Sequence, residues 1–268
     1  MADSYHPTGL AAYRPAEIAR RIDEAGVQKA RLALLPLTAL GMLAGAFIGF
    51  GALFFLVTMT GAADAGFGPS RLLGGAAFSL GLILVVVGGA ELFTGNTLIV
   101  MARMAGHIST AALLRNWLVV YPANLVGALG LVALVWAAGT LELADGAVGA
   151  TAARVAEAKF ALTPLEVFAR GILCNALVCL AIWLTFAADS AGSKILCILW
   201  PITAFVALGF EHSVANMALL PLGLIAGAAG TVADVVVNLV FSTLGNIVGG
   251  AGGVALTYWV IYLRGRRD

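Results

Sequence analysis

Charged side chains are scarce in this sequence. Only 11% of its 268 residues are Asp, Glu, Lys or Arg, whereas a soluble globular domain carries about 25%. Hydrophobic residues make up 61% and the mean hydropathy is +1.00. Apolar runs of roughly 18 residues or more, long enough to cross a bilayer, recur along the chain. This composition excludes an ordinary soluble domain and predicts an all-α polytopic membrane protein.

Cysteine and net charge are also low. The three cysteines, Cys174, Cys179 and Cys197, lie in apolar segments and form no Cys-x-x-Cys pair, so we expect buried free thiols. A formal net charge of +1 gives no reason to expect nucleic acid as a partner. No metal-ligand set or activated nucleophile is present, so the sequence predicts no catalytic residue, metal or cofactor. Residues 1–31 lack the apolar segment of a signal peptide.

Polar residues inside the apolar runs are concentrated in two short stretches. One is Gly-Phe-Glu-His-Ser-Val-Ala-Asn at 209–216. The other, Gly-Ala-Glu-Leu-Phe-Thr-Gly-Asn at 89–96, lies 120 positions earlier and repeats the frame Gly-x-Glu-x-x-x-x-Asn. An ionisable group at membrane depth is energetically costly, so by default it marks a functional site. We interpret the two stretches as paired interruptions of two membrane helices.

The hydropathy pattern predicts six spans, of which the second and fifth are broken. They are expected at 32–59, 71–104, 113–138, 163–188, 194–220 and 232–263. Eleven of the 15 basic residues fall on the side that holds both termini, so both termini should be cytoplasmic. The expected divisions are a tail with an amphipathic interfacial helix (1–31), a first three-span repeat (32–138), an external connection (139–162), a second repeat (163–263) and a basic cytoplasmic tail (264–268).

The repeat extends beyond the two interruptions. The spacing Asn-x₇-Asn-x₂-Gly occurs at Asn116, Asn124 and Gly127 and again at Asn238, Asn246 and Gly249, at an offset of 122. Each half holds three crossings, so the second half must be inverted relative to the first. Inverted repeats with broken helices place a substrate site near the middle of the bilayer.

Several of these stretches resemble the formate/nitrite transporter family, over roughly residues 14–264. They are Glu-Leu-Phe-Thr-Gly-Asn (91–96), Arg-Asn-Trp-Leu-Val-Val-Tyr (115–121), Arg-Gly-Ile-Leu-Cys-Asn (170–175), Gly-Phe-Glu-His-Ser-Val-Ala-Asn-Met (209–217) and Asn-Ile-Val-Gly-Gly (246–250). The resemblance implies an aquaporin-like protomer with six transmembrane helices, a homopentamer in the bacterial cytoplasmic membrane, and one pore in each protomer.

Matching the motifs residue by residue implies a role for each matched position. The central pore histidine falls on His212, its neighbouring glutamate on Glu211, the pore-loop threonine on Thr94, the vestibule lysine on Lys159 and a nearby asparagine on Asn175. The implied gates are Leu82, Leu92, Phe93 and Phe78, with an outer constriction at Phe205 and Val178. Without the resemblance we would assign these apolar residues to helix packing, and Lys159 competes with a plain solvated lysine.

The predicted site must offset the desolvation of an anion, which costs several kcal/mol. We expect helix N-termini after Gly95 and Ser213 to point N–H groups at the midplane. Thr94 and Asn175 supply hydrogen-bond donors, and His212 supplies a proton or a charge. Glu91 and Glu211 would repel an anion. We therefore interpret them, with Asn96 and Asn216, as structural brackets that accept backbone N–H groups of their own interruption.

The predicted function is pH-dependent transport of a small monovalent weak-acid anion, formate first, with proton coupling through His212. Nitrite is the close alternative, and hydrosulfide or lactate are more distant ones. A neutral-solute channel of aquaporin type would fit the inverted repeat, but the paired Asn-Pro-Ala motifs are missing. A membrane enzyme using Glu211 and His212 lacks supporting residues. Segment 1–31, amphipathic and next to the cytoplasmic mouth, is the candidate gate.

Overall fold

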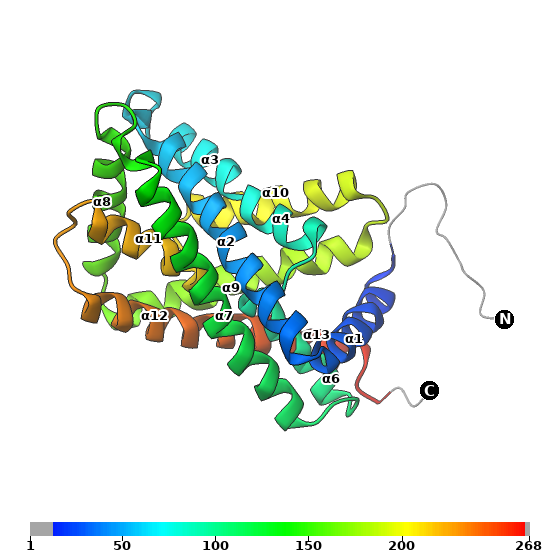
Figure 1. Cartoon of the computed structure of the whole chain (residues 1–268). Helices are drawn as coiled ribbons and strands as arrows, with labels where there is room; N and C mark the ends of the chain where they lie inside the picture. The colour runs from blue at the N-terminus through cyan, green and yellow to red at the C-terminus, as the bar shows by residue number, and fades with distance from the viewer. Residues whose placement is uncertain (1–12, 266–268) are drawn as a thin grey trace.

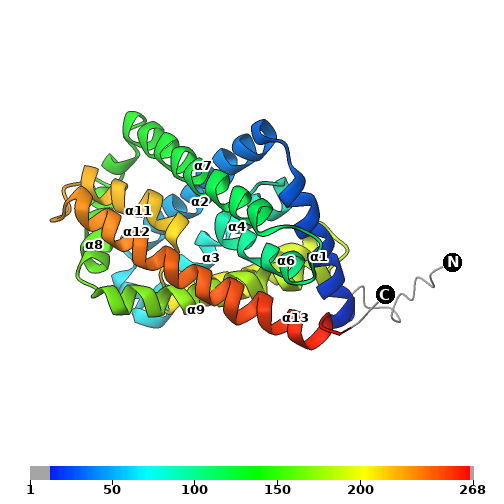
Figure 2. The ribbon, with the colours of Figure 1, turned by 90° about the horizontal axis from the view of Figure 1, so that it is seen from below.

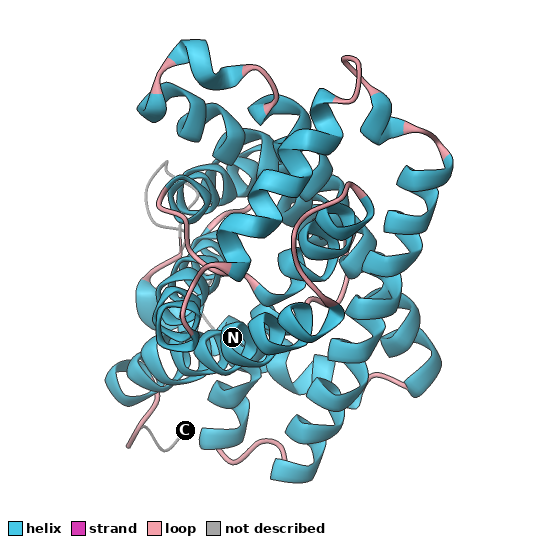
Figure 3. Cartoon of the chain, turned by 90° about the vertical axis from the view of Figure 1, so that its left-hand side faces the viewer, coloured by secondary structure: helices cyan, strands magenta, loops and turns pink. Residues whose placement is uncertain are grey.

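The computed structural model describes residues 13–265, and within them the chain is helical without a β-strand (Figure 3). The predicted N-terminal tail before Tyr13 and the end of the basic tail at 266–268 lie outside the described residues. The helices are α1 (Pro15–Arg31), α2 (Leu34–Met59), α3 (Phe67–Phe78), α4 (Leu80–Gly88), α5 (Phe93–Asn96), α6 (Val100–Met104), α7 (Thr110–Ala137), α8 (Ala147–Phe160), α9 (Pro164–Ala187), α10 (Ala191–Ala207), α11 (Ser213–Ile225), α12 (Val232–Ile247) and α13 (Thr257–Tyr262).

Five of the described helical segments are long and apolar enough to cross a membrane. They are Leu34–Met59, Phe67–Gly88, Thr110–Ala137, Pro164–Ala187 and Val232–Tyr262. Two shorter apolar helices, α10 and α11, follow one another where the sequence predicts the fifth span. The chain is therefore a multi-pass membrane protein by the length and composition of its helices.

The amphipathic helix α1 packs on the body of the protein along one face. Its Pro15 occupies the first turn, where a missing N–H is tolerated, and Ile18 and Ile22 are buried. The sequence placed Asp23 on the solvated face, and this expectation is wrong. Asp23 is buried, and its Oδ2 lies 2.8 Å from Nδ1 of His107 in the loop before α7. The spacing of apolar residues along a helix does not reveal that Asp23 pairs with a residue of a distant loop.

Several segments after residue 138 differ from the predicted pattern. Helix α8 begins at Ala147, well before the predicted short helix, and α11 continues through Pro221 to Ile225 instead of ending at Leu220. A proline removes one N–H, and neighbouring helices in a membrane protein can compensate for the freed carbonyl. Residues Val248–Leu256 form a π-helix between α12 and α13 that the sequence pattern did not indicate.

Two long helix pairs cross closely at glycines, α2 with α7 and α9 with α12. A Cβ at Gly45 would collide with the backbone of Asn124, and one at Gly127 with that of Met42. In the second pair, a Cβ at Gly245 on α12 would collide with the backbone of Phe168 on α9. Small residues at these crossings let the backbones approach, which is the main route to tight packing between membrane helices.

The described ends of the chain lie together. In Figures 1 and 2, α1 and α13 are at one end of the molecule, and α8 with the connection from α11 to α12 is at the opposite end. The cysteines carry no disulfide: Cys174 and Cys179 are buried and Cys197 is half-buried.

Candidate functional site

Each of the two polar stretches is a short non-helical connection between two helices. Helix α4 ends at Gly88 and α5 begins at Phe93, whereas α10 ends at Ala207 and α11 begins at Ser213. The turn out of the first helix uses a glycine at positive φ in both cases, Gly89 at +80° and Gly209 at +73°. Only glycine adopts this backbone region at no steric cost.

One asparagine on α7 holds the first connection. The amide of Asn124 donates to the carbonyls of Gly41 (2.7 Å) and Glu91 (2.9 Å), and its Oδ1 accepts from the backbone N–H of Phe93 (2.9 Å). All of these groups are buried and away from water, so each bond removes the penalty of an unpaired polar group. Asn124 thereby fixes the connection to helices α2 and α7.

An asparagine on α12 holds the second connection in the same way. The amide of Asn246 donates to the carbonyls of Gly171 (2.8 Å) and Glu211 (2.9 Å), and its Oδ1 accepts from the backbone N–H of Ser213 (2.9 Å). The two sets of contacts match group for group. The Asn-x₇-Asn spacing that the sequence repeats therefore corresponds to a repeated hydrogen-bond arrangement.

The carboxylate of Glu211 lies in a buried polar cluster. Its Oε1 is 2.7 Å from Lys159 Nζ, and its Oε2 accepts from Asn216 (2.7 Å) and Asn238 (3.3 Å). Asn216 also donates to Asn238 Oδ1 at 2.7 Å. A buried carboxylate is stable only when paired and hydrogen-bonded in this manner.

The carboxylate of Glu91 has the equivalent cluster in the other half. Lys29 Nζ lies 2.5 Å from Glu91 Oε1 and 3.2 Å from Asn96 Oδ1. Asn96 donates to Glu91 Oε2 (2.8 Å) and to Asn116 Oδ1 (2.9 Å). Lys29 lies on α1, on the polar face that the sequence assigned to solvent, so its part in this cluster was missed.

The glutamates accept bonds from side chains, which corrects one detail of the expectation. The sequence predicted that Glu91 and Glu211 accept backbone N–H groups of their own interruption. Those N–H groups, at Phe93 and Ser213, are instead taken by the two asparagines. Each carboxylate binds a lysine and asparagine amides, two at Glu211 and one at Glu91, a set that only the tertiary contacts bring together.

His212 sits between the two connections. Its Nδ1 accepts from the backbone N–H of Ala215 (3.0 Å), and its Nε2 lies 3.0 Å from Thr94 Oγ1. Because Nδ1 accepts a bond, the proton of the neutral ring is assigned to Nε2. The Nε2–H then donates to the Thr94 hydroxyl, whose own proton is left for another acceptor. The ring of Phe205 stacks on His212 at 5.8 Å between centroids.

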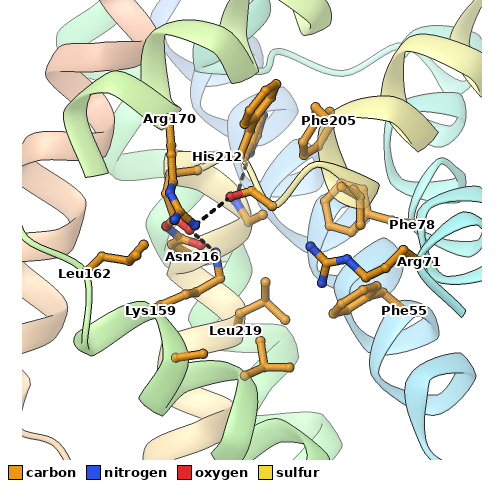
Figure 4. A pocket seen from close by; sticks show the side chains of 17 residues that line it. Phe55, Arg71, Phe78, Lys159, Leu162, Arg170, Phe205, His212, Asn216 and Leu219 are labelled. Atoms are coloured by element: carbon orange, nitrogen blue, oxygen red, sulfur yellow. Dashed lines mark hydrogen bonds and ion pairs between the residues drawn. The ribbon is translucent and has the colours of Figure 1, made fainter. Parts of the chain in front are cut away.

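Two cavities lie in opposite halves of the molecule: His212 lines the first, and the second reaches Gly95, the residue after Thr94, without including Thr94 or His212. We call the first, of about 170 Å³, the Lys159 cavity; its lining includes Phe55, Arg71, Phe78, Lys159, Arg170, Phe205, Phe210, Glu211, His212, Asn216 and Leu219 (Figure 4). The second, of about 430 Å³, is the Lys29 cavity; its lining includes Lys29, Leu32, Leu40, Val85, Gly89, Glu91, Leu92, Asn96, Ile182 and Phe186. Each cavity therefore holds one of the two lysine–glutamate pairs.

The apolar residues predicted as gates occupy different places. Phe78 and Phe205 line the Lys159 cavity and meet edge to face at 5.5 Å between centroids, and Leu92 lines the Lys29 cavity. Leu82 and Val178 are buried and are absent from the linings of these two cavities.

Phe93 packs against helix α7. Its ring makes edge-to-face contacts with Tyr121 (4.8 Å) and Trp117 (5.9 Å), and it is absent from the linings of the Lys159 and Lys29 cavities. A part in gating stays a prediction for Phe93 and for the other five residues.

Asn175 and Ser213 are fully buried. The amide of Asn175 donates to the carbonyls of Thr94 (3.1 Å) and Asn246 (2.6 Å), so it ties the two halves together beside the histidine. The Asn175 Oδ1 and the Ser213 Oγ have no hydrogen-bond partner among the described residues. Direct contact of either side chain with a substrate stays a prediction.

Two arginines of the Lys159 cavity were not singled out by the sequence. Arg71 comes from α3 and Arg170 from α9, and both are half-buried beside the turn at Gly209. Arg71 was counted only among the basic residues of the far membrane side and Arg170 only as a residue within the fourth span, with no role at the site for either. Among residues 13–265, no group of three or more His, Cys, Asp and Glu is placed to hold a metal.

A bundle of apolar helices that encloses two cavities, each with a lysine–glutamate pair and one also lined by a buried histidine, defines a membrane protein with polar groups in its interior. The Formate/nitrite transporter family profile matches residues 16–260. The chain belongs to this family.

Individual relatives agree over almost the whole length. The formate channel FocA of Escherichia coli strain K12 is 42% identical over 269 residues, covering 93% of this chain and 94% of that protein. A probable formate transporter of Methanothermobacter thermautotrophicus is 41% identical, covering 93% and 97%.

Solved structures share the fold. A pentameric formate channel with formate bound superposes with a TM-score of 0.79 at 41% identity, covering 86% of this chain and 98% of that chain. An ion channel of the same family superposes with a TM-score of 0.84 at 32% identity, covering 91% and 98%. The relatives are channels and transporters rather than enzymes.

Proposed function

We propose that this protein is a channel for small monovalent weak-acid anions, with formate as the first substrate, and that His212 couples transport to protons. The observation that carries the proposal is the buried Thr94–His212 hydrogen bond of 3.0 Å, which joins the two halves at the wall of the Lys159 cavity. The formate channels among the relatives support the choice of substrate.

The proposed route runs through an inverted repeat of six crossings. The crossings are α2, the broken pair α3–α4 with α5–α6, α7, α9, the broken pair α10 with α11, and α12–α13. The matching contacts of Asn124 and Asn246 support the two-fold relation. The matching lysine–glutamate clusters add α1 and α8 to the repeat, because Lys29 and Lys159 come from these helices.

The proposed orientation places both termini in the cytoplasm of a bacterium, with the chain in the inner membrane. The excess of basic residues on the terminal side supports this. The Lys29 cavity then opens to the cytoplasm and the Lys159 cavity to the outside. A homopentamer with one pore per protomer is proposed because a related solved channel is pentameric.

In the proposed mechanism, the His212 ring is neutral until an anion binds beside it, and only then takes up the proton that it passes to the anion. A proton can reach Nδ1 only after the bond from Ala215 N–H breaks, since an imidazolium accepts no hydrogen bond. An anion held by the Thr94 hydroxyl would stabilise the imidazolium charge. The anion then takes the proton from Nε2 and passes the apolar residues as a neutral acid, which leaves the neutral ring protonated at Nδ1. Loss of that proton to water and uptake of one at Nε2 restore the bonds to Ala215 and Thr94.

The apolar residues on either side are the proposed barriers to ions. Leu92, Leu82 and Phe93 would act on the cytoplasmic side, and Phe78, Phe205 and Val178 on the outer side. The segment 1–31 is the proposed cytoplasmic gate, since Lys29 ties α1 to Glu91 and withdrawal of α1 would break that pair. Deleting 1–31 without any change in pH response would contradict this.

The test is formate flux into proteoliposomes containing purified wild-type protein or His212→Phe. We expect wild-type flux to rise as the external pH falls and the variant to lose most of this dependence. Unchanged flux and pH dependence in His212→Phe would overturn the mechanism. Parallel assays with nitrite, hydrosulfide and lactate decide among the substrates.

A further inference from the structure

The Lys159 cavity is lined by more positive charge than the carboxylate of Glu211 can neutralise. Lys159 is paired with Glu211, but the lining also includes Arg71 and Arg170. Arg71 Nε donates to the Ala207 carbonyl at 3.0 Å and Arg170 Nη1 to the Gly209 carbonyl at 3.3 Å. Figure 4 shows Arg71 reaching in from one side of the cavity and Arg170 with Lys159 from the other.

Both guanidinium groups lie close to the backbone at Gly209. A Cβ placed on Gly209 would lie 3.1 Å from Arg71 Nη2 and 3.8 Å from Arg170 Nη1. The two charges are close enough to repel one another electrostatically. Two like charges that are half-buried beside the same turn disfavour each other, and a bound anion would relieve that repulsion.

No carboxylate among the described residues forms an ion pair with either arginine. Glu211 is the one carboxylate in the cavity lining, and Lys159, Asn216 and Asn238 occupy it. Glu166, one turn before Arg170 on α9, accepts from Thr163 at the helix start. Each guanidinium donates one hydrogen bond to protein, which leaves N–H groups on both facing the cavity region.

We propose that Arg71 and Arg170 form a binding site for a small planar oxyanion, a carboxylate of the formate type, at the mouth of the Lys159 cavity. The inference rests on the proposed function and deepens it, because the site would hold the anion before it reaches His212. Guanidinium groups match the two oxygens of such an anion in a bidentate geometry.

The site exists in one half of the molecule only. The Arg170 carbonyl accepts from Glu211 N–H at 3.4 Å, and its equivalent in the other half is the Leu40 carbonyl, which accepts from Glu91 N–H at 3.2 Å. Leu40 lines the Lys29 cavity, whose charged lining residues are Lys29 and Glu91, already paired. An anion entering from the Lys159 side therefore meets a binding step that the other side lacks.

A purely structural role is the competing explanation. Both arginines donate to carbonyls at the C-terminal end of α10, where a cation also favours the helix dipole. Capping alone would contribute to stability, and it would affect transport equally from both sides. A difference between the two directions separates the explanations.

The experiment measures formate uptake as a function of concentration in right-side-out and inside-out membrane vesicles that contain the full chain. For Arg71→Gln combined with Arg170→Leu, we expect the half-saturation concentration from the Lys159 side to rise about tenfold, as for loss of a charge-assisted contact. The rise should exceed any change in maximal rate and be absent from the other side. Arg154→Gln removes a charge from α8 outside the cavity lining and is the matched control.

Two further arms keep the result decisive. Arg170→Lys keeps the positive charge but loses the paired N–H donors of the guanidinium group. Full recovery of wild-type behaviour in this variant would therefore overturn a bidentate site. Saturation-transfer NMR on the formate proton with purified protein should show weaker transfer in the double variant. If that variant does not assemble, Arg170→Gln, which keeps an amide donor for Gly209, takes its place.

An equal shift in both directions, or no shift, would overturn the arginine site while leaving the proposed channel intact. Absence of formate flux through the wild-type protein from either side would instead refute the proposed function itself.

Discussion

The lysine–glutamate clusters of the two halves share their main contacts, a lysine on one carboxylate oxygen and an asparagine amide on the other, but differ in their surroundings. Lys159 is 16% exposed and Glu211 2%, whereas Lys29 is 32% exposed and Glu91 8%. The Lys29 cavity is also the larger of the two, about 430 Å³ against about 170 Å³. The same polar scaffold is therefore used once beside a roomy, electrically balanced cavity and once beside a tight, positively charged one.

The residues that follow each glutamate differ most. Leu92 and Phe93 follow Glu91, whereas His212 and Ser213 follow Glu211. The backbone of both pairs is held by equivalent asparagine contacts. A repeated scaffold thus carries an apolar pair in one half and the titratable ring in the other. The following three predictions test how far the equivalence extends.

The largest effect is expected from the asparagines that hold the connections. Asn124→Ala and Asn246→Ala each leave the carbonyl of a glutamate and one N–H unpaired in a buried site, and each also removes a bond to a helix carbonyl. We expect each substitution to lower the free energy of unfolding by about 4 kcal/mol. Chemical unfolding of the purified protein in detergent measures it. A difference of more than about 1 kcal/mol between the two variants would break the equivalence.

The glutamates should differ where the asparagines agree. Glu211→Ala leaves Lys159 unpaired in a nearly dry site, and we expect a loss of about 3 kcal/mol. Glu91→Ala should cost less, because water can reach Lys29. The same unfolding assay compares them, and removing both partners with Lys159→Met and Glu211→Leu should recover much of the loss. A larger effect at Glu91 would contradict the contrast in burial.

The smallest effect is expected at the glycines that turn the chain. Gly89→Ala forces a side chain into positive φ, for which we expect about 1–2 kcal/mol. Gly209→Ala should cost more, because its Cβ would also crowd Arg71. Gly68→Ala, on an exposed turn of α3 with open space around it, is the control and should be neutral or stabilising. Equal losses at Gly89 and Gly209 would argue that Arg71 moves freely.

Much of the scaffold could be predicted from residue patterns. The interruptions at Glu91 and Glu211 and the repeated Asn-x₇-Asn spacing correspond to the observed connections and their holding asparagines. The patterns succeeded because a costly polar residue inside an apolar run is conspicuous in itself. The continuation of α11 through Pro221 was missed because the compensation for a proline comes from neighbouring helices.

The sequence by itself determined that this is a helical membrane protein with two paired polar interruptions, since hydropathy and glycine spacing are local properties. Only the tertiary structure decided that Lys29 pairs with Glu91, that Asp23 is buried, and that Arg71 meets Arg170 beside Gly209. These contacts join elements far apart in the chain. They depend on how each helix is rotated and on which face meets its neighbour, which no local pattern specifies.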